Sequence, residues 1–265
     1  MTISLGQYIP TKSVVHRADP RTKFLAMIGY MVAVMLIETF IGYGIATLFV
    51  ISVYLVAKLP MKYVFKSIRP VIYIVLFTML INLFIHDGHT VWFSWRFITI
   101  YKESVFYCIK IMLRVILLVM GASVLTYTTA STSLTDGLES LMSPLKIIRF
   151  PAHDIAMMMS IALRFIPTFA DELDRIVKAQ MARGADFDSK NIIKKVRSYI
   201  PVLIPLFVSA WRRAADLANA MNARGYRGGE GRTKYRVLKF TLIDLVMAII
   251  MILFISLIVI LRILL

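Results

Sequence analysis

The sequence predicts an all-α membrane protein, with about five transmembrane helices and a cytoplasmic or interfacial region of one short and two long crossing helices. Three observations predict this class. The 265 residues are 59% hydrophobic, and their mean hydropathy of +0.76 is too high for an ordinary soluble domain. Several uncharged runs approach the ~20 residues that a helix needs to cross a bilayer. A charged stretch with helical spacing separates the last run from the others.

Five apolar segments are candidate spans, and they divide the chain into three predicted domains. The candidate spans are residues 24–37, 40–57, 71–85, 105–127 and 240–261. We expect an N-terminal membrane domain with four spans over residues 1–127, a cytoplasmic domain over residues 128–236 and a C-terminal transmembrane helix over residues 237–265. Because the first 23 residues are basic and contain no short apolar core, they lack the pattern of a cleavable signal peptide.

The basic residues of the short loops predict the orientation. Eight lie before the first span or between the second and third spans, whereas two lie in the loops on the opposite side. Since Lys and Arg accumulate in cytoplasmic loops, we expect a multi-pass protein of the cell membrane with a cytoplasmic N-terminus. The whole chain has 31 basic and 15 acidic residues, and this excess suits the lipid bilayer or an acidic protein partner.

Lys110 and Arg114 stand one helical turn apart within the fourth candidate span. A charge at the bilayer centre costs about 3 kcal/mol on insertion scales. Two interpretations remain open: both side chains face protein or the membrane interface, or they line a transport path. Cys108, the single cysteine, is interpreted as a core or lipid-facing residue.

Residues 128–236 have the spacing of amphipathic helices, expected over residues 133–145, 151–183 and 191–224. In both long helices an uncharged stretch is followed by charged residues. The uncharged stretches are too short for an ordinary span and are typical of a buried or interfacial helix.

Small residues recur on the second long helix at Ala210, Ala214 and Ala218. Small side chains at a spacing of four let another helix approach closely, so we expect the two long helices to cross there. The alternative remains open that these alanines are only good helix formers.

The tripeptide Ala-Arg-Gly ends both long helices. It occurs as Ala182, Arg183 and Gly184 and again as Ala223, Arg224 and Gly225. Glycine there is typical of a helix C-terminal cap, and the preceding arginine complements the helix dipole. A functional interpretation stands beside this one: each end presents a guanidinium, whose planar fork of donors suits carboxylates, to one of two similar acceptor surfaces.

With these tripeptides and the block His-Arg-Ala-Asp-Pro-Arg-Thr-Lys at residues 16–23, the sequence resembles the EcfT family. These proteins are the transmembrane T components of energy-coupling factor transporters and are related to the CbiQ-type cobalt permeases. In the block, Asp19 is expected to cap a helix that begins at Pro20. The resemblance implies that residues 128–236 form a coupling domain.

The resemblance also implies partners. Arg183 and Arg224 would each dock in an acidic groove of one of two ATP-binding A subunits, either a homologous pair or a homodimer. A small integral membrane S component would bind a vitamin or a metal. The T component would relay the motion of the ATPases so that the S component reorients and releases its substrate inward.

Other functions fit the sequence less well. It contains no G-x-x-x-x-G-K-[ST] loop, so we expect no catalytic activity in this chain and assign ATP hydrolysis to its partners. It contains no HExxH or similar cluster, and we expect no metal, no cofactor and no nucleic-acid partner. The alternative is a membrane permease that forms its own substrate path, but the Glu-Ala-Ala loop typical of such permeases is absent from the sequence.

Overall fold

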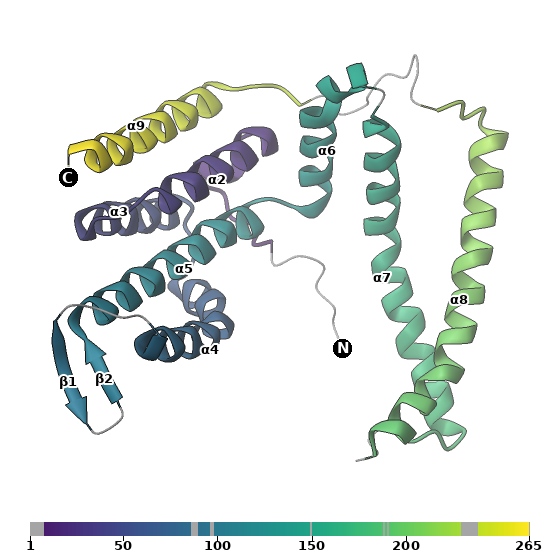
Figure 1. Ribbon diagram of the computed structural model, residues 1–265. Coiled ribbons are helices and arrows are strands. Elements are labelled where there is room, and N and C mark those ends of the chain that lie inside the picture. Colours follow the sequence, from purple (N-terminus) through teal and green to yellow (C-terminus); the bar gives the residue numbers. More distant parts are fainter. Residues whose placement is uncertain are drawn as a thin grey trace. The chain divides into compact units, whose positions relative to one another are not determined.

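The chain forms two compact units (Figure 1). The computed structural model describes residues 8–85, 90–95, 98–148, 150–187, 189, 191–228 and 238–264. The membrane unit contains residues 8–137 and 238–264 of this set, and the long-helix unit contains the described residues from 138 to 228. The domain limits predicted from the sequence remain predictions.

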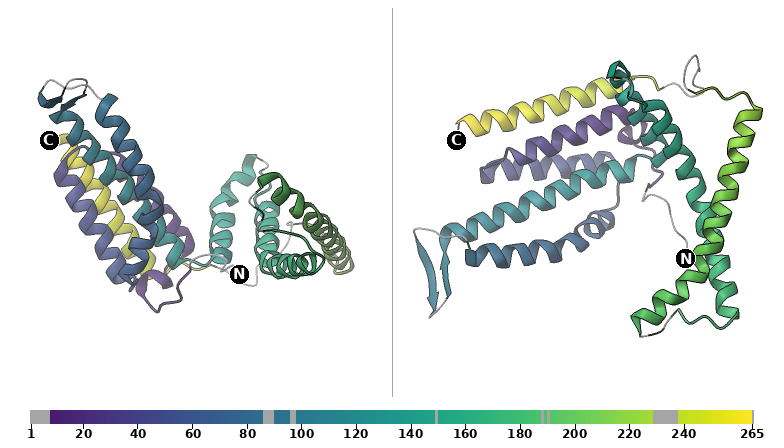
Figure 2. Two further views of the ribbon diagram at one scale, coloured as in Figure 1. Left: turned by 90° about the horizontal axis from the view of Figure 1, so that it is seen from below. Right: turned by 45° about the vertical axis from the view of Figure 1, so that its right-hand side comes forward.

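The membrane unit is a bundle of helices that lie side by side (Figures 1 and 2). Its helices are α1 (Val14–Arg17), α2 (Pro20–Met35), α3 (Phe40–Val56), α4 (Met61–Ile85), α5 (Lys102–Thr128) and α9 (Leu242–Leu264). Within the described residues α4, α5 and α9 are long and apolar enough to cross a membrane, whereas α2 and α3 have 16 and 17 residues. The predicted class, an all-α membrane protein, is confirmed, and the number of five spans remains a prediction.

The start of α4 corrects one expectation. The uncharged run of the third span begins at residue 71, and the basic residues before it were expected in a loop, but α4 begins at Met61. Lys62, Lys66 and Arg69 therefore lie on the helix and not in a loop. Lys and Arg have high helix propensity, so a helix continues through them even where the apolar run does not.

A short β-hairpin connects α4 to α5, where the sequence analysis expected only a loop. Its strands are β1 (Val91–Trp95) and β2 (Ile98–Tyr101), which pair antiparallel. Both strands consist mostly of β-branched and aromatic residues, which favour strands. The exposed side chain of Trp92 lies on this hairpin.

Aromatic side chains hold the helices of the membrane unit together. The rings of Tyr30 on α2, Phe49 on α3 and Phe254 on α9 stack, and the centroids of Phe49 and Phe254 are 4.2 Å apart. The Tyr30 hydroxyl donates to the carbonyl of Leu117 on α5 at 3.2 Å. A side chain at Gly121 on α5 would overlap the Tyr30 ring, so glycine is needed there for close packing. The four helices thus share one packed core.

Arg114 on α5 faces protein. Its Nη2 donates to the carbonyl of Ile37, just after α2, at 2.8 Å, and the Tyr43 hydroxyl donates to the same oxygen at 3.2 Å. The guanidinium thereby satisfies a carbonyl that the end of a helix leaves free. Nζ of Lys110 lies 5.4 Å from the centroid of the Phe40 ring, within the range of a cation–π contact. For Arg114, the interpretation that it faces protein is confirmed.

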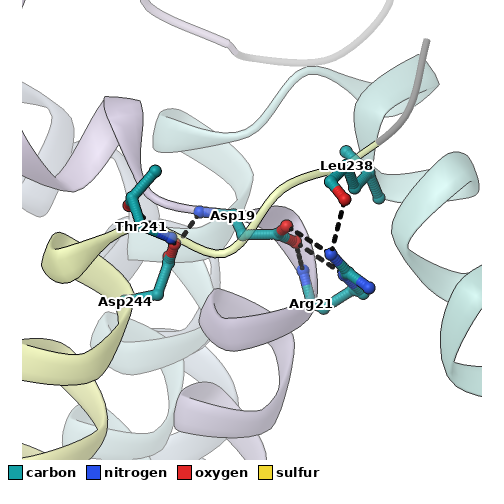
Figure 3. A network of polar contacts seen from close by, with 5 residues as sticks. All are labelled: Asp19, Arg21, Leu238, Thr241 and Asp244. Carbon is teal, nitrogen blue, oxygen red and sulfur yellow. Dashed lines mark hydrogen bonds and ion pairs between the residues drawn. The ribbon is translucent and has the colours of Figure 1, made fainter.

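A polar network, the α2–α9 clasp, joins the starts of two helices that are far apart in the sequence (Figure 3). Asp19 caps α2 by accepting from the backbone of Arg21 at 2.9 Å, as predicted. Asp244 on α9 accepts from the backbone N–H groups of Asp19 and Thr241, each at 2.7 Å. Arg21 pairs with Asp19 at 2.8 Å and donates to the carbonyl of Leu238 at 3.2 Å. The clasp consists of Asp19, Arg21, Thr241 and Asp244.

The long-helix unit contains the predicted helices with nearly the predicted limits. The elements are α6 (Ser131–Met142), whose first half belongs to the membrane unit, a 3-10 helix (Ser143–Ile148), α7 (Ala152–Ala182) and α8 (Ile192–Ala223). α7 and α8 run antiparallel (Figures 1 and 2). Asn191 caps α8 by accepting from the backbone of Ile193 at 3.0 Å.

The turn between α7 and α8 is fixed by two contacts. The buried ring of Phe187 packs edge-on against Tyr199 of α8, with centroids 5.2 Å apart. The Ser198 hydroxyl donates to the carbonyl of Asp186 at 2.8 Å. These contacts place the end of α7 beside the second turn of α8.

Candidate functional site

The first Ala-Arg-Gly tripeptide ends α7 in a Schellman cap. The backbone N–H of Gly184 donates to the carbonyl of Met181, and that of Ala185 donates to the carbonyl of Gln180, both at 2.9 Å. Gly184 has φ +88°, a conformation that favours glycine. A Cβ added there would meet no atom within 4 Å, so the backbone conformation and not lack of space requires glycine. Arg183 is the C-cap residue.

The second tripeptide ends α8 in the same way. Gly225 donates to the carbonyl of Asn222 at 2.9 Å, and Tyr226 donates to that of Met221 at 3.0 Å. Gly225 has φ +70°, and Arg224 is the C-cap residue. The prediction that both glycines cap their helices is confirmed. Both caps have the same hydrogen-bond pattern, so each arginine occupies the same position relative to the end of its helix.

Both tripeptides are exposed on the surface of the long-helix unit, including the alanines at positions 182 and 223. Within the part of the chain that the structure describes, neither Arg183 nor Arg224 makes a side-chain hydrogen bond or ion pair. Cap geometry uses only the backbone of each arginine, so it does not account for the identity of the side chain. That these guanidinium groups contact a partner remains a prediction.

The two arginines are far apart. Arg183 lies close to Ser198, because Ser198 bonds to the turn just beyond Arg183. Arg224 lies 26 positions further along α8 than Ser198, which at ~1.5 Å per residue gives roughly 40 Å. The two guanidinium groups therefore present separate positive charges at opposite ends of the long-helix unit.

The three alanines at which the long helices were expected to cross face α7. Ala210, Ala214 and Ala218 line a cleft of about 310 Å³ between the two long helices, opposite Phe165 and Phe169 of α7. Ala210 is half-buried, and the other two alanines are exposed to this cleft. Their small side chains thus border open space between the helices, and a tight crossing at these three positions remains a prediction.

An ion pair that the sequence did not indicate bridges α7 and α8 beside the cleft. Arg213 Nη2 lies 3.0 Å from Glu172 Oε2, and the guanidinium lies 5.9 Å from the centroid of the Phe169 ring. A hydrogen bond from Ser209 lowers the pKa of Glu172, and Arg213 lowers it further. No spacing rule connects residues on two different helices, so this contact could not be found before the fold was known.

One side of α8 is apolar and exposed. Large hydrophobic side chains lie there over about four turns: Val196, Ile200, Leu203, Ile204, Phe207 and Trp211. Exposed apolar surface of this extent marks a site of protein–protein or membrane interaction. The uncharged stretch at residues 198–211 had already indicated a buried or interfacial helix.

The described residues contain no group of three His, Cys, Asp or Glu side chains that could hold a metal ion. His153 pairs with Glu139 at 3.0 Å within the long-helix unit. Cys108 is buried, and its thiol donates to the carbonyl of Met79 at 3.5 Å, which agrees with its interpretation as a core residue.

Comparison with known proteins relates nearly the whole chain to transporter components. Residues 11–235 match the cobalt transport protein family, CbiQ. The chain is 51% identical over 242 residues to the energy-coupling factor transporter transmembrane protein EcfT of Ruminiclostridium cellulolyticum, with 91% of this chain and 90% of that protein covered. It is 49% identical to EcfT of Acidaminococcus fermentans, with 94% and 92% covered. Identity to EcfT of Bacillus subtilis is 45%, with 89% of each chain covered.

The family match extends from α1 through α8 and includes both Ala-Arg-Gly caps. Together with the membrane helices of the fold, they show that the chain is a multi-pass membrane component of a transporter. The chain therefore belongs to the CbiQ cobalt transport protein family and, within it, to the EcfT transmembrane proteins of energy-coupling factor transporters.

Proposed function

We propose that this chain is the coupling subunit of an importer that takes up a vitamin or a metal. It relays ATP-driven motion of two ATP-binding subunits to a small membrane subunit that binds the substrate. The N-terminus lies in the cytoplasm, as the basic residues of the short loops favour. The chain itself catalyses no reaction.

The observation that carries the proposal is the pair of identical helix ends. Arg183 and Arg224 each follow an exposed alanine and precede a capping glycine, and neither guanidinium has a side-chain partner in the described structure. A separation of roughly 40 Å is too large for one acidic groove and suits one groove on each of two subunits. The caps fix the backbone at each arginine, which limits the backbone entropy lost on binding.

The apolar side of α8 suits the second partner. Its exposed side chains include Leu203, Phe207 and Trp211. An apolar helix face of this kind packs against the helices of a membrane protein, and aromatic residues dominate such interfaces energetically. Because this face and Arg224 are on the same helix, motion of a subunit bound at Arg224 moves the surface that would contact the substrate-binding subunit.

Substitution of the two arginines tests the proposal. Removing one partner of a buried charged pair costs ~2–5 kcal/mol in binding. We expect Arg183→Ala or Arg224→Ala alone to weaken one attachment while the other retains the complex through effective concentration. The double variant should lose the ATP-binding subunits on co-purification and should lose substrate uptake. Lysine should restore only part of the binding, since an ammonium lacks the planar fork.

Lys178→Ala is the matched control, because Lys178 is an exposed cation near the end of the same helix but outside the tripeptide. If the arginines only complement the helix dipole, alanine costs ~0.3–1 kcal/mol of local stability and assembly is unchanged. The double variant is compared with the original chain at matched membrane expression. If it still co-purifies with both ATP-binding subunits and transports normally, the docking proposal is refuted.

A further inference from the structure

An apolar groove in the membrane unit is not used by the proposed coupling mechanism. It has a volume of about 510 Å³ and lies between α2, α3, α5 and α9. Its length runs along α9 from Leu242 to Met251. Nine residue steps at ~1.5 Å give roughly 14 Å, about half of the ~30 Å thickness of the hydrocarbon core. The groove is therefore as deep as one leaflet.

A buried ammonium lies at one end of this groove. Lys23 lines the groove and is 6% exposed. Its Nζ donates to the carbonyls of His16 and Thr128, each at 3.1 Å. Within the described residues it has no third acceptor and no carboxylate within ion-pair distance. An ammonium has three N–H donors, so this group lacks one hydrogen bond, and the carboxylates of Asp19 and Asp244 act on its charge only from beyond ion-pair distance.

Residues of α1 lie at the Lys23 end of the groove. Val14 and Val15 line this end, whereas the exposed side chains of Lys12 and Arg17 do not belong to the groove lining. A buried charge without a direct ion pair is costly. An anionic oxygen at Lys23 would supply the missing hydrogen bond and an opposite charge in direct contact.

We propose that this groove binds one acyl chain of an anionic phospholipid and that Lys23 binds an oxygen of its phosphate. The lipid comes from the leaflet on the side of Lys23. The apolar lining of Val53, Val246 and Ile250 matches a hydrocarbon chain.

Photo-crosslinking of the purified full-length chain in lipid nanodiscs tests the proposal. The probes are phosphatidylglycerol and phosphatidylcholine with the same diazirine-labelled acyl chain, and labelled peptides are identified by mass spectrometry. One lysine near an anionic headgroup favours the anionic lipid about fivefold. We therefore expect labelling at groove peptides of α3 and α9 to be about fivefold higher with phosphatidylglycerol. Lys23→Met should reduce this ratio to about one.

If Lys23→Met does not fold, a groove-filling variant tests whether the acyl chain binds in the groove. Val53→Phe with Met247→Phe occupies the groove from both walls and should abolish groove labelling by either lipid. Leu253→Phe is the control, because Leu253 is an exposed residue of α9 that does not line the groove, and its labelling should equal that of the original chain.

Three results would overturn the proposal. The first is equal labelling of the groove by both lipids in the original chain. The second is labelling that persists in the groove-filling variant. The third is loss of groove labelling when the chain is purified in complex with its co-expressed membrane partners, which would assign the groove to a partner helix.

Discussion

Asp244 is the residue through which the clasp joins α9 to α2, and Asp244→Ala should destabilise the membrane unit. The substitution removes the acceptor of the Asp19 backbone N–H, a buried bond of 2.7 Å to a carboxylate. Hydrogen bonds to charged groups contribute about 1.5–3 kcal/mol. It also removes the capping bonds from the backbone and hydroxyl of Thr241, and the loss of a cap costs about 0.5–2 kcal/mol.

The sum is about 2–5 kcal/mol. For a chain of this size 1 kcal/mol shifts the unfolding midpoint by about 2–4 °C, so the expected decrease is roughly 4–20 °C. The assay is thermal unfolding in detergent followed by circular dichroism. Glu38→Ala provides the control, because Glu38 also pairs with a residue of α9, Arg262, at 2.9 Å, but both side chains are about half exposed or more.

Exposed ion pairs contribute about 0–1 kcal/mol, so the control should change the midpoint by only a few degrees. If Asp244→Ala and Glu38→Ala unfold at the same temperature, the clasp does not stabilise the unit. The attachment of α9 would then rest on apolar packing alone.

Three further substitutions test other parts of the structure. Gly121→Ala places a methyl group against a buried tyrosine ring and should cost about 1–3 kcal/mol, whereas Gly44→Ala, with open space around it in α3, should keep or slightly raise the unfolding midpoint, because alanine favours a helix more than glycine does. Burial lowers the pKa of His16, so the unfolded chain binds the proton more readily. The unfolding midpoint should therefore fall as pH decreases below about 6.5. In His16→Gln the midpoint should fall less over the same pH range, as measured by thermal unfolding. Ala214→Leu places its side chain in the cleft between α7 and α8 and should reduce substrate uptake without lowering the unfolding midpoint, while Ala179→Leu on an exposed face of α7 should leave uptake unchanged. Equal uptake in these last two variants would show that filling the cleft does not impair transport.

Features that depend on neighbouring residues could be predicted from the sequence. The limits of both long helices followed from their hydrophobic spacing and their caps, and Gly184 and Gly225 adopt the positive φ that a helix-ending glycine indicates. Asp19 caps α2 as expected from its place before a proline. In each case the deciding hydrogen bonds connect residues within one helical turn, so a short stretch of sequence contains all the information.

Contacts between distant residues were decided only by the tertiary structure. Asp244 lies near the start of the last candidate span, where the sequence indicates no partner for it, and its bond to Asp19 joins residues 225 positions apart. Arg114 reaches a carbonyl 77 positions away, which settled an interpretation that its sequence position had left open. Lys23 belonged to a recognised motif, but only the packing of α2, α3, α5 and α9 creates an apolar groove beside it. Helical periodicity specifies which face of a helix is apolar, but not which other helix covers it, because many pairings bury similar apolar area.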